Sequence, residues 1–230
     1  GYSMNRINIA IDGFSGCGKS TLARDVARSL KYTFIDSGAM YRAITYACQG
    51  NYSQKHVLKI LSGQPAISIS SDGDLIFDGI ALGDELRTRE VSSNVSKVAA
   101  IEEVREYLKN VQQALIRKKG VVMEGRDITS VIMPHAELKV FITASPQIRA
   151  ERRYNQLINK GIDVDIASVQ KELQERDKMD MNREHAPLTL VNDAIVLDTS
   201  NLSTVEQLRT LISIATPMID PSLTSGLIKR

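Results

Sequence analysis

The stretch INIAIDGFSGCGKS, from Ile7 to Ser20, decides the fold of this chain. Its first six residues, Ile7 to Asp12, form a short apolar run that predicts a buried strand, and a helical pattern follows from about Lys19 to Leu30. Between them, Gly13 to Ser20 match G-x-x-x-x-G-K-S/T in the strand–loop–helix context of a phosphate-binding loop. The stretch therefore predicts a site for a nucleoside triphosphate.

The chemistry of such a loop explains its residue types. Glycines let the backbone curl with its N–H groups inward, and the start of a helix adds positive potential for phosphate oxygens. Lys19 is expected to reach the β- and γ-phosphates, and the Ser20 hydroxyl to ligate Mg²⁺, so we expect ATP with Mg²⁺ as cofactor. The residues predicted to bind ATP are Gly13, Phe14, Ser15, Gly16, Cys17, Gly18, Lys19, Ser20 and Thr21.

Short apolar runs alternate with helical patterns along the rest of the chain. Further strands are expected at residues 33–36, 121–124, 138–142 and 194–197, and further helices at about 39–48 and 204–215. Alternation of this kind is typical of a parallel sheet covered by helices. With the phosphate loop it predicts an α/β protein of the P-loop NTPase fold, whose central parallel sheet is flanked by helices.

Two stretches interrupt this alternation. Residues 67–82 contain two β-like segments around a turn at 71–74, which predicts a small antiparallel hairpin inserted into the core. Residues 145–183 are polar, helical and rich in arginine, and are expected to form a short helical lid. We therefore expect a single domain over residues 1–230, with a core of 4–37, 111–144 and 184–230, a β-containing insertion of about 38–110 and a lid of about 145–183.

The composition limits the classes of function. With 43% hydrophobic residues, 24% charged residues and a net charge of +2, the chain does not indicate a nucleic-acid-binding surface. Cys17 and Cys48 are expected to be reduced thiols. No signal peptide precedes Ile7, and no apolar run approaches the roughly 18 residues of a membrane span. We expect a cytoplasmic protein without membrane or nucleic-acid partners and, lacking a coiled-coil seam, a monomer.

Arginines and carboxylates follow the predicted strands, where the ligand crevice of an open α/β sheet lies. Transfer of a phosphoryl group between two polyanions requires positioned arginines and Mg²⁺. Ser37 and Arg42 follow the second strand and either face this crevice or belong to a helix cap and an exposed surface. We favour the crevice, because the phosphate loop opens into it.

The segment Glu124 to Asp127 follows the third strand. Glu124 is expected to hold Mg²⁺ through water, and Arg126 and Asp127 to face the acceptor; the alternative is a turn with an internal salt bridge. In the polar stretch, the run Arg149 to Arg153 is usually explained by a solvated helix face. Arg176, Asp180 and Arg183 fall on one helix face, either as an ion-pair ladder or as a stripe that binds phosphate and sugar, and spacing alone does not decide.

Together these segments resemble bacterial-type cytidylate kinases. The resemblance covers about residues 7–215 and depends on the following segments: Ile11–Gly13 with the phosphate loop, Asp36–Arg42, Leu86–Thr88, Ser96–Ala99, Val104–Arg105, Gly125–Asp127, Arg152–Arg153, Glu175–Asp177, Asp180, Arg183 and Ala186–Leu188. The 67–82 insertion is similar to the extended monophosphate-binding region of that family. The resemblance implies ATP-dependent phosphorylation of CMP and dCMP to CDP and dCDP.

The resemblance also implies a role for each matched residue. Lys19, Arg152 and Arg153 would stabilise the transferred phosphoryl group, the two arginines from the lid. The residues implied to bind CMP are Ser37, Arg42, Arg126 and Arg183 around the acceptor phosphate, Ser96, Arg105 and Asp127 at the cytosine, and Arg176 and Asp180 at the ribose. The assignment fits the base, because the cytosine N4 amino group donates and its N3 and O2 accept, whereas uracil reverses the polarity at positions 3 and 4.

The chain departs from the family pattern in four places. Glu124 stands where Asp is expected, Thr129 interrupts the usual small step after the Arg-Asp pair, and Met179 and Met181 occupy positions that are often charged. Two other functions remain open from the residues alone. One is a P-loop kinase of another small acceptor, which would not depend on Asp127, and the other is a nucleotide-dependent switch protein that hydrolyses ATP slowly.

Overall fold

A computed structural model describes residues 4–70, 73–184 and 187–223. The chain divides into two compact units, which we describe separately. Ile35–Lys118 form the smaller unit, and the segments before and after it form the larger unit. Ser71 and Asp72 of the predicted turn, and Ala186 of a family-like segment, lie outside the described residues. The boundaries of the insertion and the lid stay a prediction.

The larger unit is built on a five-stranded sheet with the strand order β2-β6-β1-β7-β8, in which only Thr33 and Phe34 of β2 fall within that unit. Strand β1 pairs in parallel with β6 and β7, and β7 pairs in parallel with β8, which confirms the predicted central parallel sheet. The elements are β1 (Asn8–Gly13), α1 (Lys19–Leu30), β2 (Thr33–Asp36), β6 (Val121–Gly125), the π-helical turn η2 (Ile128–Ile132), β7 (Leu138–Thr143), α6 (Pro146–Asn159), α7 (Ile166–Asn182), β8 (Ile195–Asp198) and α8 (Thr204–Ile219).

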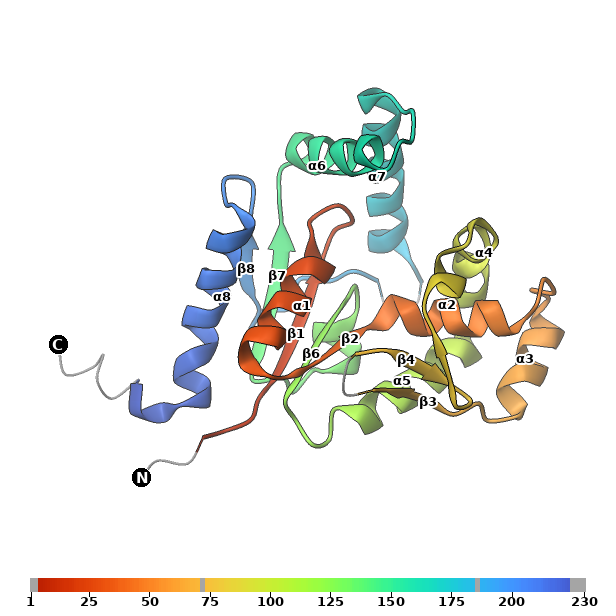
Figure 1. The fold of residues 1–230 in the computed structure, drawn as a ribbon, viewed down its shortest axis with the longest axis horizontal. Coiled ribbons are helices and arrows are strands. Elements are labelled where there is room, and N and C mark those ends of the chain that lie inside the picture. The colour runs from red at the N-terminus through yellow and green to blue at the C-terminus, as the bar shows by residue number, and fades with distance from the viewer. Residues whose placement is uncertain (1–3, 71–72, 185–186, 224–230) are drawn as a thin grey trace. The chain divides into compact units, whose positions relative to one another are not determined.

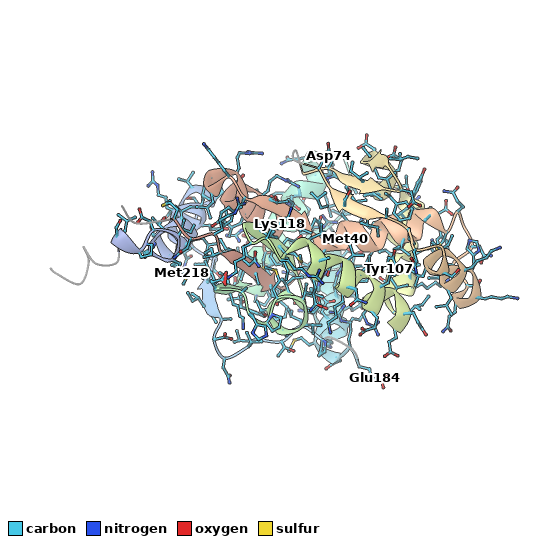
Figure 2. All side chains as sticks on the ribbon, turned by 90° about the horizontal axis from the view of Figure 1, so that it is seen from below. Met40, Asp74, Tyr107, Lys118, Glu184 and Met218 are labelled. Atoms are coloured by element: carbon cyan, nitrogen blue, oxygen red, sulfur yellow. The ribbon has the colours of Figure 1, made fainter. Side chains whose placement is uncertain are left out.

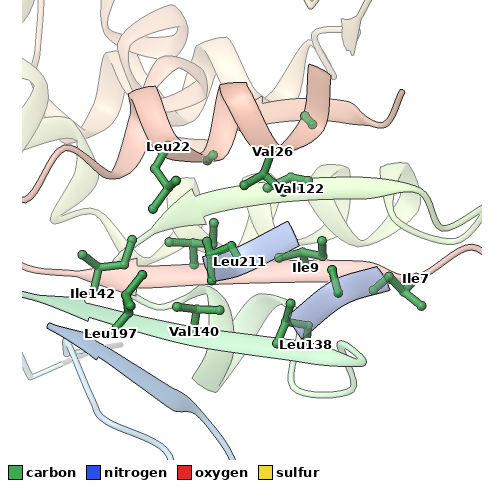
Figure 3. Close-up of a cluster of buried hydrophobic side chains, with 14 of the residues drawn as sticks. Ile7, Ile9, Leu22, Val26, Val122, Leu138, Val140, Ile142, Leu197 and Leu211 are labelled. Atoms are coloured by element: carbon green, nitrogen blue, oxygen red, sulfur yellow. The ribbon is translucent and has the colours of Figure 1, made fainter. Parts of the chain in front are cut away.

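Helices α1 and α8 cover one face of this sheet and enclose its main core. The period-2 pattern of the strands points Ile9 of β1, Val122 of β6 and Val140 of β7 to the same cluster, where Leu22 and Leu211 meet them from the helices (Figure 3). Burial of one such side chain stabilises the fold by roughly 1.5–3 kcal/mol. This core holds β1 rigidly behind the loop that leaves its carboxyl end.

Helices α6 and α7 lie side by side beyond the carboxyl ends of the strands (Figure 1). A small core of Ala150, Val169 and Leu173 joins the two helices. Ser145 caps α6 and Asp165 caps α7, each by accepting a hydrogen bond from a backbone N–H of the first turn. The predicted lid is therefore a helical hairpin with its own apolar contact.

The smaller unit combines helices with a short sheet. Its elements are α2 (Ser37–Ala47), α3 (Gln54–Ser62), β3 (Ile67–Ile69), β4 (Leu75–Phe77), β5 (Ile80–Leu82), the 3₁₀ helix η1 (Asp84–Arg87), α4 (Arg89–Ala99) and α5 (Glu102–Leu115). Met40 of α2 is fully buried and accepts a hydrogen bond from Gln112 of α5, while Tyr107 of α5 donates to the carbonyl of Pro65 (Figure 2). Side chains of α5 thus fix both α2 and the start of the sheet.

The predicted hairpin is present, but a third strand extends it. Strands β3, β4 and β5 form an antiparallel sheet in that order. Phe77 pairs with Ile80, which leaves a two-residue loop of Asp78 and Gly79, both with positive φ. This geometry is typical of the Asp-Gly hairpin turn. Two strands were expected within residues 67–82, and the third strand, β5, was not.

No helix within the described ranges is both long enough and apolar enough to cross a membrane.

Candidate active site

The loop between β1 and α1 has the backbone of a phosphate-binding loop. Gly16 and Gly18 both have φ in the left-handed region, at 78° and 75°, where a side chain would be strained. Gly18 is the residue that caps α1, and because glycine has no side chain the cap itself satisfies none of the N–H groups of the first turn. The N–H groups and the positive end of the helix dipole are therefore left for an anion.

Lys19 and Ser20 lie at the start of α1, as predicted. The Lys19 ammonium is buried and donates a 3.0 Å hydrogen bond to the carbonyl of Phe14 in the loop. Burial lowers its pKa, and the nearby Glu124 carboxylate opposes this effect. The Ser20 hydroxyl donates to Glu124 Oε1 at 2.7 Å. A hydroxyl and a carboxylate, both hard oxygen donors, thus adjoin the loop, and this donor set fits Mg²⁺.

Asp12, the residue before the loop, is fully buried and anchors the segment that follows β6. Its carboxylate accepts hydrogen bonds from the backbone N–H groups of Ile128 and Thr129, each at 2.9 Å, and from the Thr129 hydroxyl at 2.6 Å. Burial raises the pKa of Asp12, while these donors and Lys19 act in the opposite direction. Sequence reasoning did not identify this anchor.

Arg126 and Asp180, both predicted to bind CMP, contact each other. Arg126 Nε lies 2.6 Å from Asp180 Oδ2, and Arg126 Nη2 donates to the Ser15 hydroxyl at 2.6 Å. The arginine after β6 therefore links the phosphate loop to α7. Because Arg126 keeps about a quarter of its side chain exposed, it is accessible to an anion from solvent.

Asp127, Arg176 and Arg183 are the other residues of the larger unit that are predicted to bind CMP. Asp127 is half-buried, and Arg176 lies exposed on α7. Arg183 follows the last residue of α7 and has extended backbone, with ψ at 137°. Helix α7 carries Arg176 and Asp180, and Arg183 is its C-cap residue, so the stripe of all three residues stays a prediction.

Arg149 at the start of α6 is buried, which corrects the expectation of a solvated face for the run that it begins. Its guanidinium pairs with Asp177 of α7 at 2.8 Å, donates to the carbonyl of Ser15 at 3.3 Å and lies 5.0 Å from the centre of the Phe14 ring. It also donates to the carbonyl of Ala144. Arg149 and Asp177 thus join both lid helices to the phosphate loop, and sequence reasoning assigned neither to the site.

Arg152 and Arg153 have different surroundings although they are neighbours. Arg152 donates to the hydroxyl and the carbonyl of Thr199, at 3.0 and 2.6 Å. Arg153 is exposed, and no ion pair involves it within the part of the chain that the structure describes. Of the two predicted lid arginines, Arg153 is the one whose charge faces solvent.

The smaller unit carries the other four residues predicted to bind CMP. Ser37 is the buried first residue of α2, whose cap is Asp36. Arg42, one turn on, donates to the Leu86 carbonyl and to the Ser92 hydroxyl, both at 3.3 Å. Ser96 is exposed on α4.

Arg105 of α5 donates to the Ala99 carbonyl at 2.8 Å through Nη1. Its Nη2 is buried and lacks a hydrogen-bond partner among the described residues. A buried donor of this kind is costly unless a ligand atom accepts from it.

Comparison with known proteins gives concordant results. A sequence model described as cytidylate kinase matches residues 9–216. A cytidylate kinase from Flavobacterium psychrophilum is 46% identical over 222 residues, covering 92% of this chain and 98% of that protein. A cytidylate kinase from Phocaeicola vulgatus is 44% identical over 215 residues, covering 89% and 94%. Among solved structures, TT1252 from Thermus thermophilus has a similar fold, with a TM-score of 0.52, 18% identity and coverage of 94% and 98%.

Proposed function

The chain belongs to the cytidylate kinase family, and from this premise we propose that it transfers the γ-phosphoryl group of ATP to CMP and dCMP, giving CDP and dCDP. The observation that supports the donor half is the open N-terminus of α1 beside Lys19 and Ser20. Family membership supports the choice of acceptor. The protein is a phosphotransferase whose acceptor is a phosphate group.

The phosphate loop accounts for ATP binding in this proposal. The residues from Gly13 to Thr21 surround the phosphates, and the Lys19 ammonium turns from the Phe14 carbonyl to the β- and γ-phosphates. Ser20, and Glu124 through water, would hold Mg²⁺, which would supply positive charge to offset that of the phosphates.

Phosphoryl transfer is in-line and forms no covalent enzyme intermediate. The acceptor phosphate is already a nucleophilic anion, so no side chain needs to act as a strong general base. Lys19 stabilises charge on the transferred group from one side, and the lid supplies Arg153 and Arg152. The exposed state of Arg153 supports its role, because its charge is not committed to a protein carboxylate.

We assign nine residues to the acceptor, as the resemblance to cytidylate kinases implies, and take those of each unit in turn. From the smaller unit, Ser37 and Arg42 bind the phosphate, while Ser96 and Arg105 bind the base. From the larger unit, we assign Arg126 and Arg183 to the phosphate, Asp127 to the cytosine amino group, and Arg176 and Asp180 to the ribose. Two observations support these roles: the unpartnered Nη2 of Arg105, and the position of Arg126 next to Ser15 of the phosphate loop.

The same function suggests a compartment, an oligomeric state and the absence of certain partners. We propose that the protein acts in the cytoplasm, as a monomer and without nucleic-acid or membrane partners.

The proposal is tested by measuring ADP formation from Mg²⁺-ATP with CMP, dCMP, UMP, AMP and GMP in turn. CMP and dCMP should be the preferred acceptors. Asp127→Ala should lower kcat/KM for CMP by roughly 100-fold, because the cytosine amino group loses its acceptor, and should leave KM for ATP almost unchanged. Asp25→Ala, which removes a partly exposed carboxylate of α1, is the matched control and should behave as wild type.

Equal rates with CMP and UMP would contradict the assignment of cytosine. Matched losses of CMP turnover and ATP affinity in Asp127→Ala would show that Asp127 does not act at the base.

A further inference from the structure

We infer that Asp12 and Thr129 are positioning residues that set the orientation of Asp127, and through it the preference for cytosine over uracil. The inference rests on the proposed function, since it concerns how Asp127 performs the role assigned above. Neither residue needs to touch a substrate for this role. The observation behind it is a buried cluster of hydrogen bonds that joins the end of β1 to the segment directly after Asp127.

The carboxylate of Asp12 is fully buried, and its bonds go to two consecutive residues. Oδ1 accepts from the Ile128 N–H, and Oδ2 accepts from both the N–H and the hydroxyl of Thr129. A buried carboxylate without partners would be strongly destabilising, whereas three donors offset its desolvation. Shifting the segment would break several of these bonds at once, so its backbone has one favoured position.

The backbone carbonyl of Asp127 is hydrogen-bonded as well. Its carbonyl accepts hydrogen bonds from the N–H groups of Val131 at 2.9 Å and Ile132 at 3.2 Å. The next two N–H groups of the chain are those bound by Asp12. The Asp127 carbonyl and the N–H groups of Ile128 and Thr129 are therefore all hydrogen-bonded, which restrains the Cα position of Asp127.

Rigid placement matters because discrimination between bases depends on one polar contact. The proposed partner of Asp127 is a donor in cytosine and an acceptor in uracil. A carboxylate free to shift by an ångström could avoid the uracil carbonyl and would lose much of its selectivity. Asp12 belongs to β1, which the core encloses, so the anchor is itself immobile.

The Thr129 hydroxyl is the part of the cluster that a substitution can remove without disturbing the backbone. Thr129→Val keeps the shape of the side chain and deletes the 2.6 Å bond to Asp12. We expect the ratio of kcat/KM for CMP to that for UMP to fall about ten-fold, with KM for ATP unchanged. Thr129→Ser restores the hydroxyl and should recover most of the ratio.

Thr216→Val in α8 is the matched control, since it also removes a threonine hydroxyl bonded inside the protein, there to the Ile212 carbonyl. It should alter the melting temperature only. If Thr129→Val lowers the melting temperature but retains the wild-type ratio, the inference is overturned and Thr129 is merely structural. Thr129→Ala, which deletes the hydroxyl without adding an atom, provides the same comparison should the valine variant not fold.

Different results would contradict the proposed function and the positioning role of Asp12 and Thr129. A wild-type enzyme that does not prefer CMP over UMP contradicts the proposed function itself. A wild-type enzyme that prefers CMP, combined with unchanged selectivity in both hydroxyl-deleted variants, overturns only the positioning role.

Discussion

At the scale of single residues, two arginines near the start of α6 have opposite surroundings. Arg149 is 6% exposed and pairs with Asp177, whereas Arg153, one turn later, is exposed. Arg149 also donates to the Ser15 carbonyl of the phosphate loop and lies near the Phe14 ring. We therefore propose a structural role for Arg149 and a catalytic role for Arg153.

Substitution by methionine should separate these two roles. Arg149→Met leaves Asp177 buried without its partner and should lower the free energy of unfolding by about 3 kcal/mol. Arg153→Met should change stability by less than about 0.5 kcal/mol but should lower kcat. Urea unfolding followed by steady-state kinetics on both variants would test this.

The double variant Arg149→Met with Asp177→Leu is the control. It should regain part of the lost stability, because replacing both charges leaves no isolated carboxylate. A double variant that is less stable than Arg149→Met alone would contradict the account of a buried ion pair.

Sequence alone identified the residues of the phosphate loop because they are contiguous and their spacing carries the chemistry. It did not identify the anchor formed by Asp12, whose partners Ile128 and Thr129 lie 116 and 117 residues away. The same limit applies to Arg149 and Ser15, which are 134 residues apart. Only the folded backbone decides which of several neighbouring arginines turns inward.

At the scale of elements, capping residues account for most helix starts. Ser203 before α8 forms a capping box: its hydroxyl accepts from the Glu206 N–H, and the Glu206 carboxylate accepts from the Ser203 N–H. The backbone N–H of Ser203, followed by its hydroxyl, holds the pKa of Glu206 below its ordinary value. The capping box therefore stabilises the folded state more when Glu206 is ionised.

Ser203→Ala should therefore lower the free energy of unfolding by about 1 kcal/mol at neutral pH. A depressed pKa stabilises the folded state above the ordinary pKa of 4.5 and loses this effect as the pH falls through the folded value. The difference between wild type and variant should accordingly shrink in acid, as measured by urea unfolding at several pH values.

Thr210→Ala on the same helix serves as the comparison, since its hydroxyl donates to the Glu206 carbonyl within the helix and caps nothing. It should be neutral or slightly stabilising. An equal loss in both variants would argue against the capping box.

Elements with a strong apolar period were predictable, and elements without one were not. The three central strands of the parallel sheet, β1, β6 and β7, are buried on both sides and were recognised from their apolar runs. We did not predict strand β5, because two of its three residues are exposed and the Asp78-Gly79 turn is its main local sequence signal. Tertiary pairing with β4, and not local pattern, makes it a strand.

At the scale of the whole molecule, the chain leaves the larger unit after Phe34 and returns to it at Lys119. The residues of the phosphate loop all belong to the larger unit, and four of the proposed CMP ligands belong to the smaller one. The α/β class and the parallel sheet followed from the alternation of apolar runs. The predicted insertion of about residues 38–110 already contained Arg42, Ser96 and Arg105, whereas Ser37 was placed in the core and lies in the smaller unit.

This division predicts where each ligand slows hydrogen exchange. CMP should protect backbone amides of α2, α4 and α5, which carry Ser37, Arg42, Ser96 and Arg105, because ligand binding suppresses local opening at the contacting segments. A non-hydrolysable ATP analogue with Mg²⁺ should instead protect the loop and the first turn of α1. Hydrogen–deuterium exchange read by mass spectrometry would measure both effects.

UMP at the same concentration is the control and should protect the smaller unit less than CMP. Protection by CMP confined to the larger unit would show that the four assignments in the smaller unit are wrong.

The burial of the two cysteines has a practical consequence for chemical labelling. Cys17 lies in the larger unit and Cys48 in the smaller one, both are free thiols with about 1% exposure, and burial raises the pKa of each. An alkylating reagent reacts with an accessible thiolate, so it should spare the folded protein. Each unit therefore contains a natural reporter, and the rate at which each cysteine is alkylated would follow the opening of its own unit without any introduced probe.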